Sequence, residues 1–273
     1  MTTHTRILGK LFVLFTALLS FGVSGFAQHA REGITWKKIA DPDFVLQLQR
    51  AEGKEKSYDL TKWSELKEGV ERAANYCAYT VTNKTGDYST AVHRFSLTAD
   101  KRAARAEMKV AMGGRYREDG IYQFEGEVRF QKGVLSASHV MQIWQNMKKT
   151  QNKILIYSVR PADGGNLYVP SNVERVGTFK RLNGIYDRYN EQTGEWLKVR
   201  VIHDRAARKV SIYLGETGEL YSEYIHGEAD GDYYFKFGAY GRIPGQPLQP
   251  AVVEWRHVKM FEGERAGGAE KKN

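Results

Sequence analysis

Hydrophobic and polar residues alternate with a period of two along most of the chain after residue 76, a pattern typical of β-strands with one buried face. The stretch from Tyr233 to Tyr240 is the clearest case. Its odd-numbered residues are Tyr, Phe, Phe and Ala and can face a core. Its even-numbered residues, Tyr234, Lys236, Gly238 and Tyr240, place two phenols and an ammonium in a row on the other face. For this octapeptide alone, an exposed amphipathic strand is the simpler interpretation.

The same pattern predicts about a dozen further strands, separated by clusters of Gly, Asn and Asp that favour turns. The expected strands are 43–49, 77–82, 92–98, 105–112, 120–130, 139–145, 153–159, 178–182, 195–204, 209–214, 221–225 and 252–261. Residues 59–67 fit a turn or a short helix. Many short strands at this spacing predict an all-β fold, a β-sandwich or jelly roll of the concanavalin-like type.

The two ends of the chain depart from this pattern. Residues 1–28 contain Arg6 and Lys10, then an apolar run, then small and polar residues, which is the layout of a secretory signal peptide. The run is short for a membrane span and no cysteine follows it closely, so neither membrane insertion nor a lipid anchor is expected. Residues 29–261 are expected to form a single domain. Residues 262–273 lack apolar anchors and are expected to be a flexible tail.

Charge narrows the range of partners. The formal net charge is +9, and it becomes +7 once residues 1–28 are removed with Arg6 and Lys10. A basic secreted protein can meet nucleic acid, anionic membrane or acidic polysaccharide. Export disfavours nucleic acid, and the basic residues form no Lys/Arg tract. The single cysteine, Cys77, excludes an intramolecular disulfide and is expected to be a small buried residue.

A second segment, 105–109, places charged groups on one strand face. Arg105, Glu107 and Lys109 share this face, while the residues between them are Ala and Met. A carboxylate between two cations can orient both of them toward a bound anion. A solvated, charged strand is the simpler interpretation of the spacing alone.

A third segment, 139–145, combines an amide with an aromatic ring. Alternation places Val140, Gln142 and Trp144 on one face and His139 on the other. Glutamine can donate a hydrogen bond to a carboxylate without adding charge, and tryptophan can stack on a sugar ring. A core strand that tolerates one glutamine fits the pattern equally well.

In chain order, Arg-x-Glu-x-Lys (105–109), Gln-Ile-Trp (142–144) and Tyr-Phe-Lys-x-Gly-x-Tyr (234–240) resemble the motifs of jelly-roll polysaccharide lyases. The closest likeness is to the family 7 alginate lyases, which carry Arg-x-Glu-x-Arg, Gln-Ile-His or Gln-Ile-Val, and the same third motif. Related lyases of this fold act on glucuronan and heparin-like chains. The likeness spans residues 92–261.

The sequence departs from this family pattern twice. Lys109 stands where a second arginine is usual, and lysine does not bind a carboxylate through two parallel hydrogen bonds. Trp144 stands where a catalytic histidine is often found. His93 is the expected substitute, since its strand precedes 105–112 and can lie beside it. Alternation places His139 on the opposite strand face from Gln142, so His139 is a weaker candidate. For either histidine, a structural role is the simpler interpretation.

The signal peptide predicts a secreted or periplasmic protein, and the resemblance implies an enzyme that cleaves an acidic polysaccharide, such as alginate or glucuronan, by β-elimination. Arg105 and Gln142 would hold the substrate carboxylate, and Tyr240 would act as general acid, and also as base unless His93 helps. Lys236 and Arg105 would favour the ionised phenol through charge proximity. Substrate binding is expected from Lys236, Lys109, Glu107, Trp144 and Tyr234.

No cofactor or metal is expected, because protein donors neutralise the carboxylate; the acidic turn 228–232 has too few ligands for Ca²⁺. The runner-up is a non-catalytic β-sandwich that binds acidic polysaccharide in the same basic groove. A glycoside hydrolase is a third possibility, although no Glu-x-Asp-x-x-Glu strand is present. No serine-hydrolase elbow or zinc-protease helix motif is present either. We expect a monomer whose partner is an acidic polysaccharide, without nucleic acid and without membrane insertion.

Overall fold

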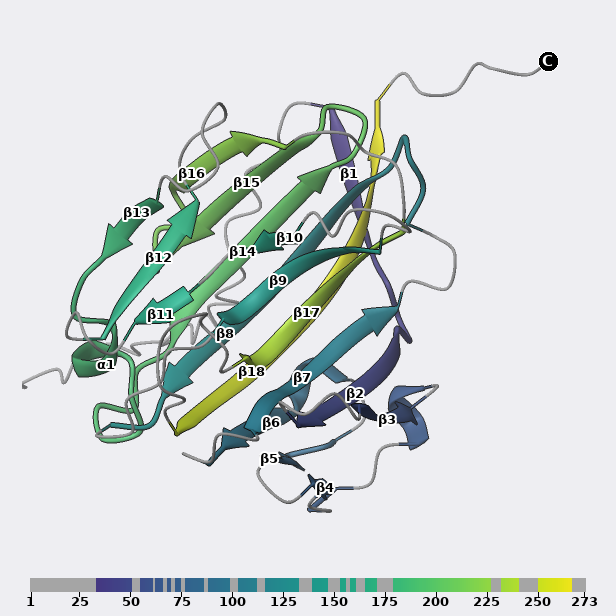
Figure 1. The fold of residues 1–273 in the computed structure, drawn as a ribbon. Coiled ribbons are helices and arrows are strands. Elements are labelled where there is room, and N and C mark those ends of the chain that lie inside the picture. The colour runs from purple at the N-terminus through teal and green to yellow at the C-terminus, as the bar shows by residue number, and fades with distance from the viewer. Residues whose placement is uncertain are drawn as a thin grey trace, which may run out of the picture.

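In the computed structural model of the chain, two antiparallel sheets pack face to face and a small third sheet lies beside them (Figure 1). The structure describes residues 33–50, 55–60, 62–65, 68–69, 72–74, 77–85, 88–98, 103–111, 116–132, 139–146, 153–155, 158–160, 165–170, 179–226, 232–240 and 250–266. The expected signal peptide (1–28), residues 228–231 of the acidic turn and residues 267–273 of the expected tail lie outside these ranges.

The larger sheet has nine strands. In spatial order they are β16 (Leu220–Ile225), β15 (Lys209–Leu214), β14 (Leu197–Asp204), β8 (Ile121–Phe130), β18 (Ala251–Arg265), β6 (Val92–Leu97), β5 (Cys77–Thr82) and β4 (Arg72–Ala74), with β1 (Ile34–Lys38) also paired to β18. The outer face of this sheet is the face directed away from the other large sheet.

The second sheet has six strands and carries the polar segments singled out above. Its order is β10 (Lys153–Leu155), β9 (His139–Asn146), β17 (Asp232–Tyr240), β7 (Ala103–Ala111), β2 (Asp43–Arg50) and β3 (Glu55–Leu60). The third sheet consists of β11 (Ser158–Arg160), β12 (Asn166–Pro170) and β13 (Phe179–Leu182). The described helical turns are η1 (Trp63–Glu65), η2 (Tyr88–Thr90) and α1 (Ile185–Arg188).

Aromatic side chains from both large sheets meet between them. Phe237 of β17 packs edge-to-face on Phe95 of β6, with 5.6 Å between ring centroids, and on Trp255 of β18 at 6.0 Å. Phe235 contacts Phe124 of β8 at 6.0 Å, and all five rings are fully buried. Such rings provide large apolar area and preferred edge contacts. The core therefore confirms the all-β sandwich and the predicted inward face of residues 233–239.

Several boundaries differ from the prediction. The expected strand 153–159 is two short strands, β10 and β11, which belong to different sheets. The expected tail was wrong at its start, because β18 continues to Arg265, where β1 pairs with it through Ile34. Strands β1, β3, β4 and β12 were not predicted. Cys77 is buried, as expected. Within the described residues, no helix is long and apolar enough to cross a membrane.

Candidate functional site

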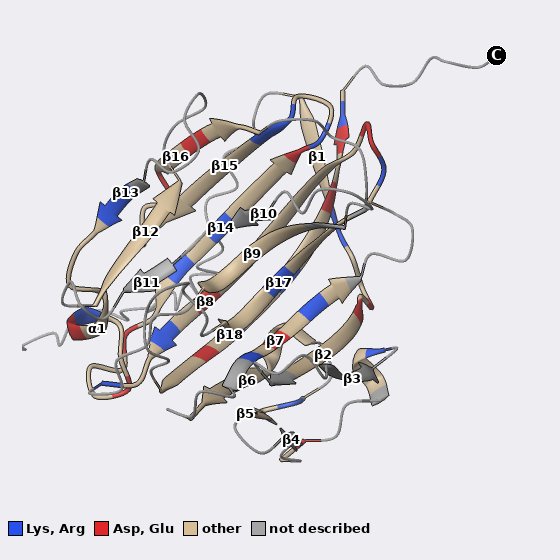
Figure 2. Cartoon of the chain, in the orientation of Figure 1, with Lys and Arg blue, Asp and Glu red and all other residues tan. Residues whose placement is uncertain are grey.

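The three polar segments lie side by side on one face of the six-stranded sheet, because β17 pairs with β7 on one edge and β9 on the other. Tyr240 is opposite Arg105, and Lys236 is opposite both Lys109 and Gln142. Directly opposed residues point to the same face of a sheet. We call this the site face; Figure 2 shows basic positions on β7 and β17 in the same region.

Glu107 holds the centre of the site face. Its side chain is 1% exposed, and its Oε1 accepts a hydrogen bond from the Gln142 amide. Its Oε2 lies 3.7 Å from Nζ of Lys236 and 3.8 Å from Nη1 of Arg105. Lys236 is itself 1% exposed. Buried charges persist when they are paired and hydrogen-bonded, so this carboxylate fixes the positions of an amide and two cations.

Gln47 of β2 completes this network and was missed from the sequence. Its Oε1 accepts a hydrogen bond from Nζ of Lys236 at 2.5 Å, and its backbone is opposite Glu107. Alternation within 43–49 does place Gln47 on the polar face of its strand. Nothing in the sequence pattern indicated that β2 pairs with β7.

At one end of the site face, Tyr240 lies between a guanidinium and an imidazole. Cζ of Arg105 is 4.9 Å from the centre of the Tyr240 ring. The His139 ring lies edge-on to the same ring, with 5.4 Å between centroids and 61° between planes. His139 is buried and Tyr240 is partly exposed. A phenol in this position can exchange a proton with a ligand while a cation stabilises its negative charge.

His139 reaches the site face through a register shift that alternation did not anticipate. Between Phe237 and Tyr240, β17 advances three residues while β9 advances two, so two residues of β17 oppose Val140. The prediction that Val140 shares a face with Gln142 is wrong: Val140 is in the core, and His139 faces Tyr240 instead. A β-bulge changes in this way which residues of two paired strands share a face.

Gly238 forms part of this bulge. Its φ of +140° is a conformation that side chains other than glycine rarely adopt. A Cβ built there would lie 2.5 Å from the Ala106 carbonyl oxygen and 2.7 Å from Cα of Glu107. The glycine therefore allows β7 and β17 to approach beneath the site, rather than leaving room for a ligand above it.

At the other end of the site face, aromatic rings pair with lysines. Nζ of Lys109 is 4.1 Å from the centre of the Tyr234 ring, and Nζ of Lys236 is 5.2 Å from the Trp144 ring. Both aromatic side chains are partly exposed. Rings with adjacent cations can stack on sugars and attract carboxylates.

His93, the predicted substitute base, is not in this group. Its strand β6 belongs to the nine-stranded sheet rather than lying beside β7, so its side chain enters the core and is fully buried. The Tyr79 hydroxyl is 2.9 Å from its Nδ1. Burial lowers the pKa of His93 to about 3, which keeps the ring neutral. The prediction of His93 at the site is therefore corrected.

The remaining described histidines also lie away from Tyr240. Nε2 of His203 is 2.9 Å from Nε2 of His226, and Nδ1 of His203 is 2.6 Å from the Tyr116 hydroxyl. His257 is on β18, where its Nδ1 lies 3.3 Å from Glu127. In the described part of the chain, no three His, Cys, Asp or Glu side chains are placed to hold a metal ion.

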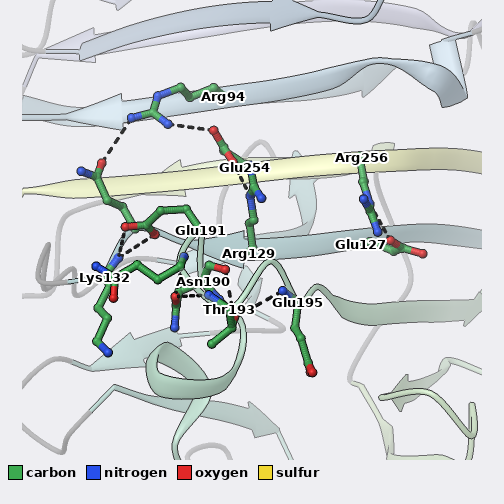
Figure 3. Close-up of polar contacts among 12 residues, drawn as sticks. Arg94, Glu127, Arg129, Lys132, Asn190, Glu191, Thr193, Glu195, Glu254 and Arg256 are labelled. Carbon is green, nitrogen blue, oxygen red and sulfur yellow. Dashed lines mark hydrogen bonds and ion pairs between the residues drawn. The ribbon is translucent and has the colours of Figure 1, made fainter.

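The outer face of the nine-stranded sheet carries a second group of charges (Figure 3). Glu254 accepts hydrogen bonds from Arg94 at 2.7 Å and from Arg129 at 2.5 Å, and Glu127 accepts one from Arg256 at 2.7 Å. A hollow of about 390 Å³ lies beside Arg94 and Glu254. In its wall, Arg94 donates to Glu254 and to Gln131, which favours a structural role.

Comparison with known proteins gives three findings. A family model described as alginate lyase matches residues 45–262. The chain is similar to a citrate-binding protein of Hevea brasiliensis, with 23% identity over 160 residues, which are 59% of this chain and 58% of that protein's length.

Two solved structures share the fold. Both are variants of the family 7 alginate lyase A1-II′, one in complex with a product (GGG) and one with a substrate (GGMG). The first has a TM-score of 0.52 and covers 81% of this chain and 95% of that chain. The second has a TM-score of 0.51 and covers 84% and 95%. Identity is 14% in both cases.

Proposed function

Because this chain belongs to the alginate lyase family, we propose that it is a polysaccharide lyase that cleaves a uronate polymer, such as alginate or glucuronan, by β-elimination. One observation carries this proposal. Across β7, β9 and β17, the described side chains include three cations but a single buried carboxylate, with a partly exposed phenol beside them. The surplus positive charge suits an anionic sugar, and the phenol can move its proton.

The first requirement of the reaction is to neutralise the substrate carboxylate, since the adjacent C–H is barely acidic while that group is charged. Arg105 and the Gln142 amide can donate to it. Glu107 orients both, because it accepts from Gln142 and lies 3.8 Å from Arg105. Lys236 adds positive charge from below, held by Gln47 and Glu107.

The second requirement is proton transfer. Tyr240, as phenolate, removes the proton from C5; the C5–H electrons form the C4–C5 double bond as the C4–O bond breaks. The leaving oxygen takes a proton from Tyr240, which returns to the phenolate. Arg105, 4.9 Å from the ring centre, stabilises that phenolate. Tyr234, Lys109 and Trp144 bind the neighbouring sugars.

The remaining parts of the proposal concern where the protein acts and with which partner. Residues 1–28 have the layout of a secretory signal peptide. We infer that the protein is exported to the periplasm or secreted and acts there on an acidic polysaccharide, as a monomer. An extracellular uronate polymer fits both this location and the basic site face.

The test follows the ultraviolet absorbance of the unsaturated product on alginate and polyglucuronate. The Tyr240→Phe substitution should lower kcat by about 10³-fold or more and leave binding of the polymer in place. Tyr213→Phe is the matched control: that ring also carries an arginine at 4.1 Å, but its strand β15 belongs to the nine-stranded sheet. An active Tyr240→Phe enzyme would refute the role of the phenol.

A second candidate function is binding of carboxylates without catalysis. Two observations favour it: the similarity to a protein named for citrate binding, and the replacement of the family's Gln-Ile-His histidine by Trp144. Calorimetric titration with citrate and with alginate oligomers distinguishes the two functions. Binding without any unsaturated product from a uronate polymer would establish this candidate in place of the lyase.

A further inference from the structure

One polar side chain of the site face, Gln47, comes from β2, a strand outside the three motif segments. Its Oε1 lies 2.5 Å from Nζ of Lys236 on β17, and these two strands are on opposite sides of β7. The two side chains therefore meet across β7, beside Glu107, whose backbone is opposite Gln47. An ammonium group only donates hydrogen bonds, so the amide oxygen of Gln47 is the atom that must face it.

Glu107 has one carboxylate oxygen that is hydrogen-bonded and one that is shared. Its Oε1 accepts from the Gln142 amide. Its Oε2 has no hydrogen-bond partner among the described residues and lies 3.7 Å from Nζ of Lys236 and 3.8 Å from Nη1 of Arg105. Both distances exceed that of a direct N–H···O hydrogen bond, which is about 2.9 Å. Oε2 is thus held between two cations without closing on either of them.

We propose that Gln47 is a positioning residue of the lyase site: it holds the Lys236 ammonium away from direct contact with Glu107, and so keeps that carboxylate shared with Arg105. This inference rests on the proposed function and adds a residue to it. An ammonium in direct contact with Oε2 would weaken the attraction that holds the Arg105 guanidinium at 3.8 Å. Arg105 would then lose the orientation in which it donates to the substrate carboxylate.

An uncharged amide suits this task because it orients the lysine without cancelling its charge. A carboxylate at position 47 would bind the ammonium at least as strongly. It would also remove part of the positive surplus with which the site face attracts an anionic polymer. A leucine of similar size would leave the charge unchanged but lose the oxygen that holds Lys236. Substitutions at position 47 therefore separate orientation of the site from attraction of the polymer.

Steady-state kinetics on a uronate polymer measure the two effects. Gln47→Leu should lower kcat by about 10- to 100-fold, the usual result of a small misplacement in an active site, with KM changed less than about threefold. Gln47→Glu should keep kcat within about threefold and raise KM by about 10-fold, and high salt should reduce that increase. An unchanged kcat in Gln47→Leu would overturn the proposal.

Gln123→Leu is the matched control. Gln123 is 3% exposed and donates to Glu125 at 2.7 Å, but it lies on β8 of the nine-stranded sheet. Its replacement should change kcat and KM by less than about twofold, because it removes a buried amide that has no contact with the site face. A loss of kcat as large as that of Gln47→Leu would show that any lost amide disturbs the enzyme, and would overturn the specific role of Gln47.

A double-mutant cycle tests whether Gln47 acts through the lysine. In a Lys236→Met background the ammonium is absent, so adding Gln47→Leu should change kcat by less than about twofold. The same loss in this background as in the unmodified enzyme would mean that Gln47 acts independently of Lys236, and would overturn the proposal. The single substitutions at the partly exposed position 47 remain decisive where Lys236→Met folds poorly.

A measurement without turnover keeps failure of this inference apart from failure of the lyase function. The Nε–H resonance of Arg105 in heteronuclear NMR spectra, identified by its loss in Arg105→Gln, reports the guanidinium directly. Gln47→Leu should shift this resonance, and Gln123→Leu should not. An unmoved resonance would overturn the role of Gln47 whether or not the protein cleaves a polymer. Absence of product from alginate and polyglucuronate with the wild-type protein would instead refute the proposed lyase function.

Discussion

The site face and the outer face use the same residue types in opposite ways. On the outer face, Glu254 and Glu127 bind their arginines at 2.5–2.7 Å (Figure 3). On the site face, Glu107 stands 3.7 and 3.8 Å from two cations and is shared between them. Each outer arginine donates to a carboxylate at hydrogen-bonding distance, whereas Arg105 of the site face stands 3.8 Å from its carboxylate and can also donate to a ligand. The geometry of the pairing, rather than the number of charges, distinguishes a site from a structural surface.

Burial adds a second difference. Glu107 and Lys236 are 1% exposed, whereas the Arg94 side chain is 45% exposed. Surface ion pairs contribute about 0–1 kcal/mol, but removing one member of a buried pair costs several times more. The site face therefore links its chemistry to folding stability more strongly than the Arg94–Glu254 pair of the outer face does.

Replacing arginine on each face should give the largest contrast. Arg105→Gln removes a donor to the substrate carboxylate and should lower kcat/KM by about 10²- to 10³-fold. Arg94→Gln, the matched change on the outer face, should alter it by less than about twofold. Initial rates on a uronate polymer measure both. Equal losses would remove the functional distinction between the two faces.

Replacing glutamate should separate the faces in stability. Glu107→Gln leaves the buried ammonium of Lys236 without its carboxylate and should lower the free energy of unfolding by about 3 kcal/mol. Glu254→Gln, whose arginine partners are more exposed, should cost about 1 kcal/mol or less. Urea unfolding monitored by fluorescence measures both changes. A larger loss for Glu254→Gln would contradict the comparison.

Acid should weaken the core between the faces before it titrates the carboxylates. The pKa of His93 is lowered by burial to about 3, so between pH 6.5 and 3 the unfolded chain binds a proton that the folded chain excludes. Stability is therefore present above pH 6.5 and lost as the pH falls, by about 2 kcal/mol between pH 7 and 5. Burial also lowers the pKa of His203, with smaller contributions from His226 and Arg205. His203 therefore contributes to the loss of stability in acid in the same direction as His93.

Urea unfolding at pH 7 and pH 5 measures this slope. His93→Phe should flatten it, whatever the substitution does to stability at pH 7. Tyr79→Phe keeps the histidine and removes the hydroxyl bonded to it, so the slope should persist. A slope unchanged in His93→Phe would place the acid sensitivity elsewhere.

Salt should produce the smallest effect and sharpen the contrast further. Raising NaCl from 0.1 to 1 M shortens the screening length from about 10 to 3 Å. The KM for a uronate polymer should rise several-fold, because the surplus charge of the site face attracts the polymer. The free energy of unfolding should change by less than about 1 kcal/mol, since the outer-face pairs contribute little. A KM independent of salt would argue against charge-guided binding.

The fold was predictable because alternation reports burial directly. Strand β5 at Cys77–Thr82 and β15 at Lys209–Leu214 match their predicted ranges. Three of the missed strands, β1, β4 and β12, have five residues or fewer, and β12 contains Pro170. The fourth, β3, overlaps the predicted turn or short helix at 59–67. Pairing partners were not predictable in this way, since alternation within a strand says nothing about its neighbour. That is why Gln47 was missed and His93 was placed beside the wrong sheet.

Within the site, the sequence motifs placed Arg105, Gln142 and Tyr240 on one face, as the structure does. Alternation placed His139 on the opposite face, and that prediction was wrong. The bulge at Gly238 lies between β17 and β9, and the same glycine closely approaches the backbone of β7; both are tertiary properties. A glycine in a strand does suggest a bulge or a close approach of two backbones. Its effect on the facing strand depends on which strand lies opposite, and the sequence does not reveal that.

The position of β17 between β7 and β9 also has a consequence for folding kinetics. Both neighbours precede residues 232–240 by many residues in the chain. Until β17 pairs with them, the facing edges of β7 and β9 have unpaired backbone groups. Pairings between such distant segments form slowly, and open edges favour association with other chains. During refolding, recovery of activity should therefore follow the docking of β17, and truncation before residue 232 should yield chains that aggregate.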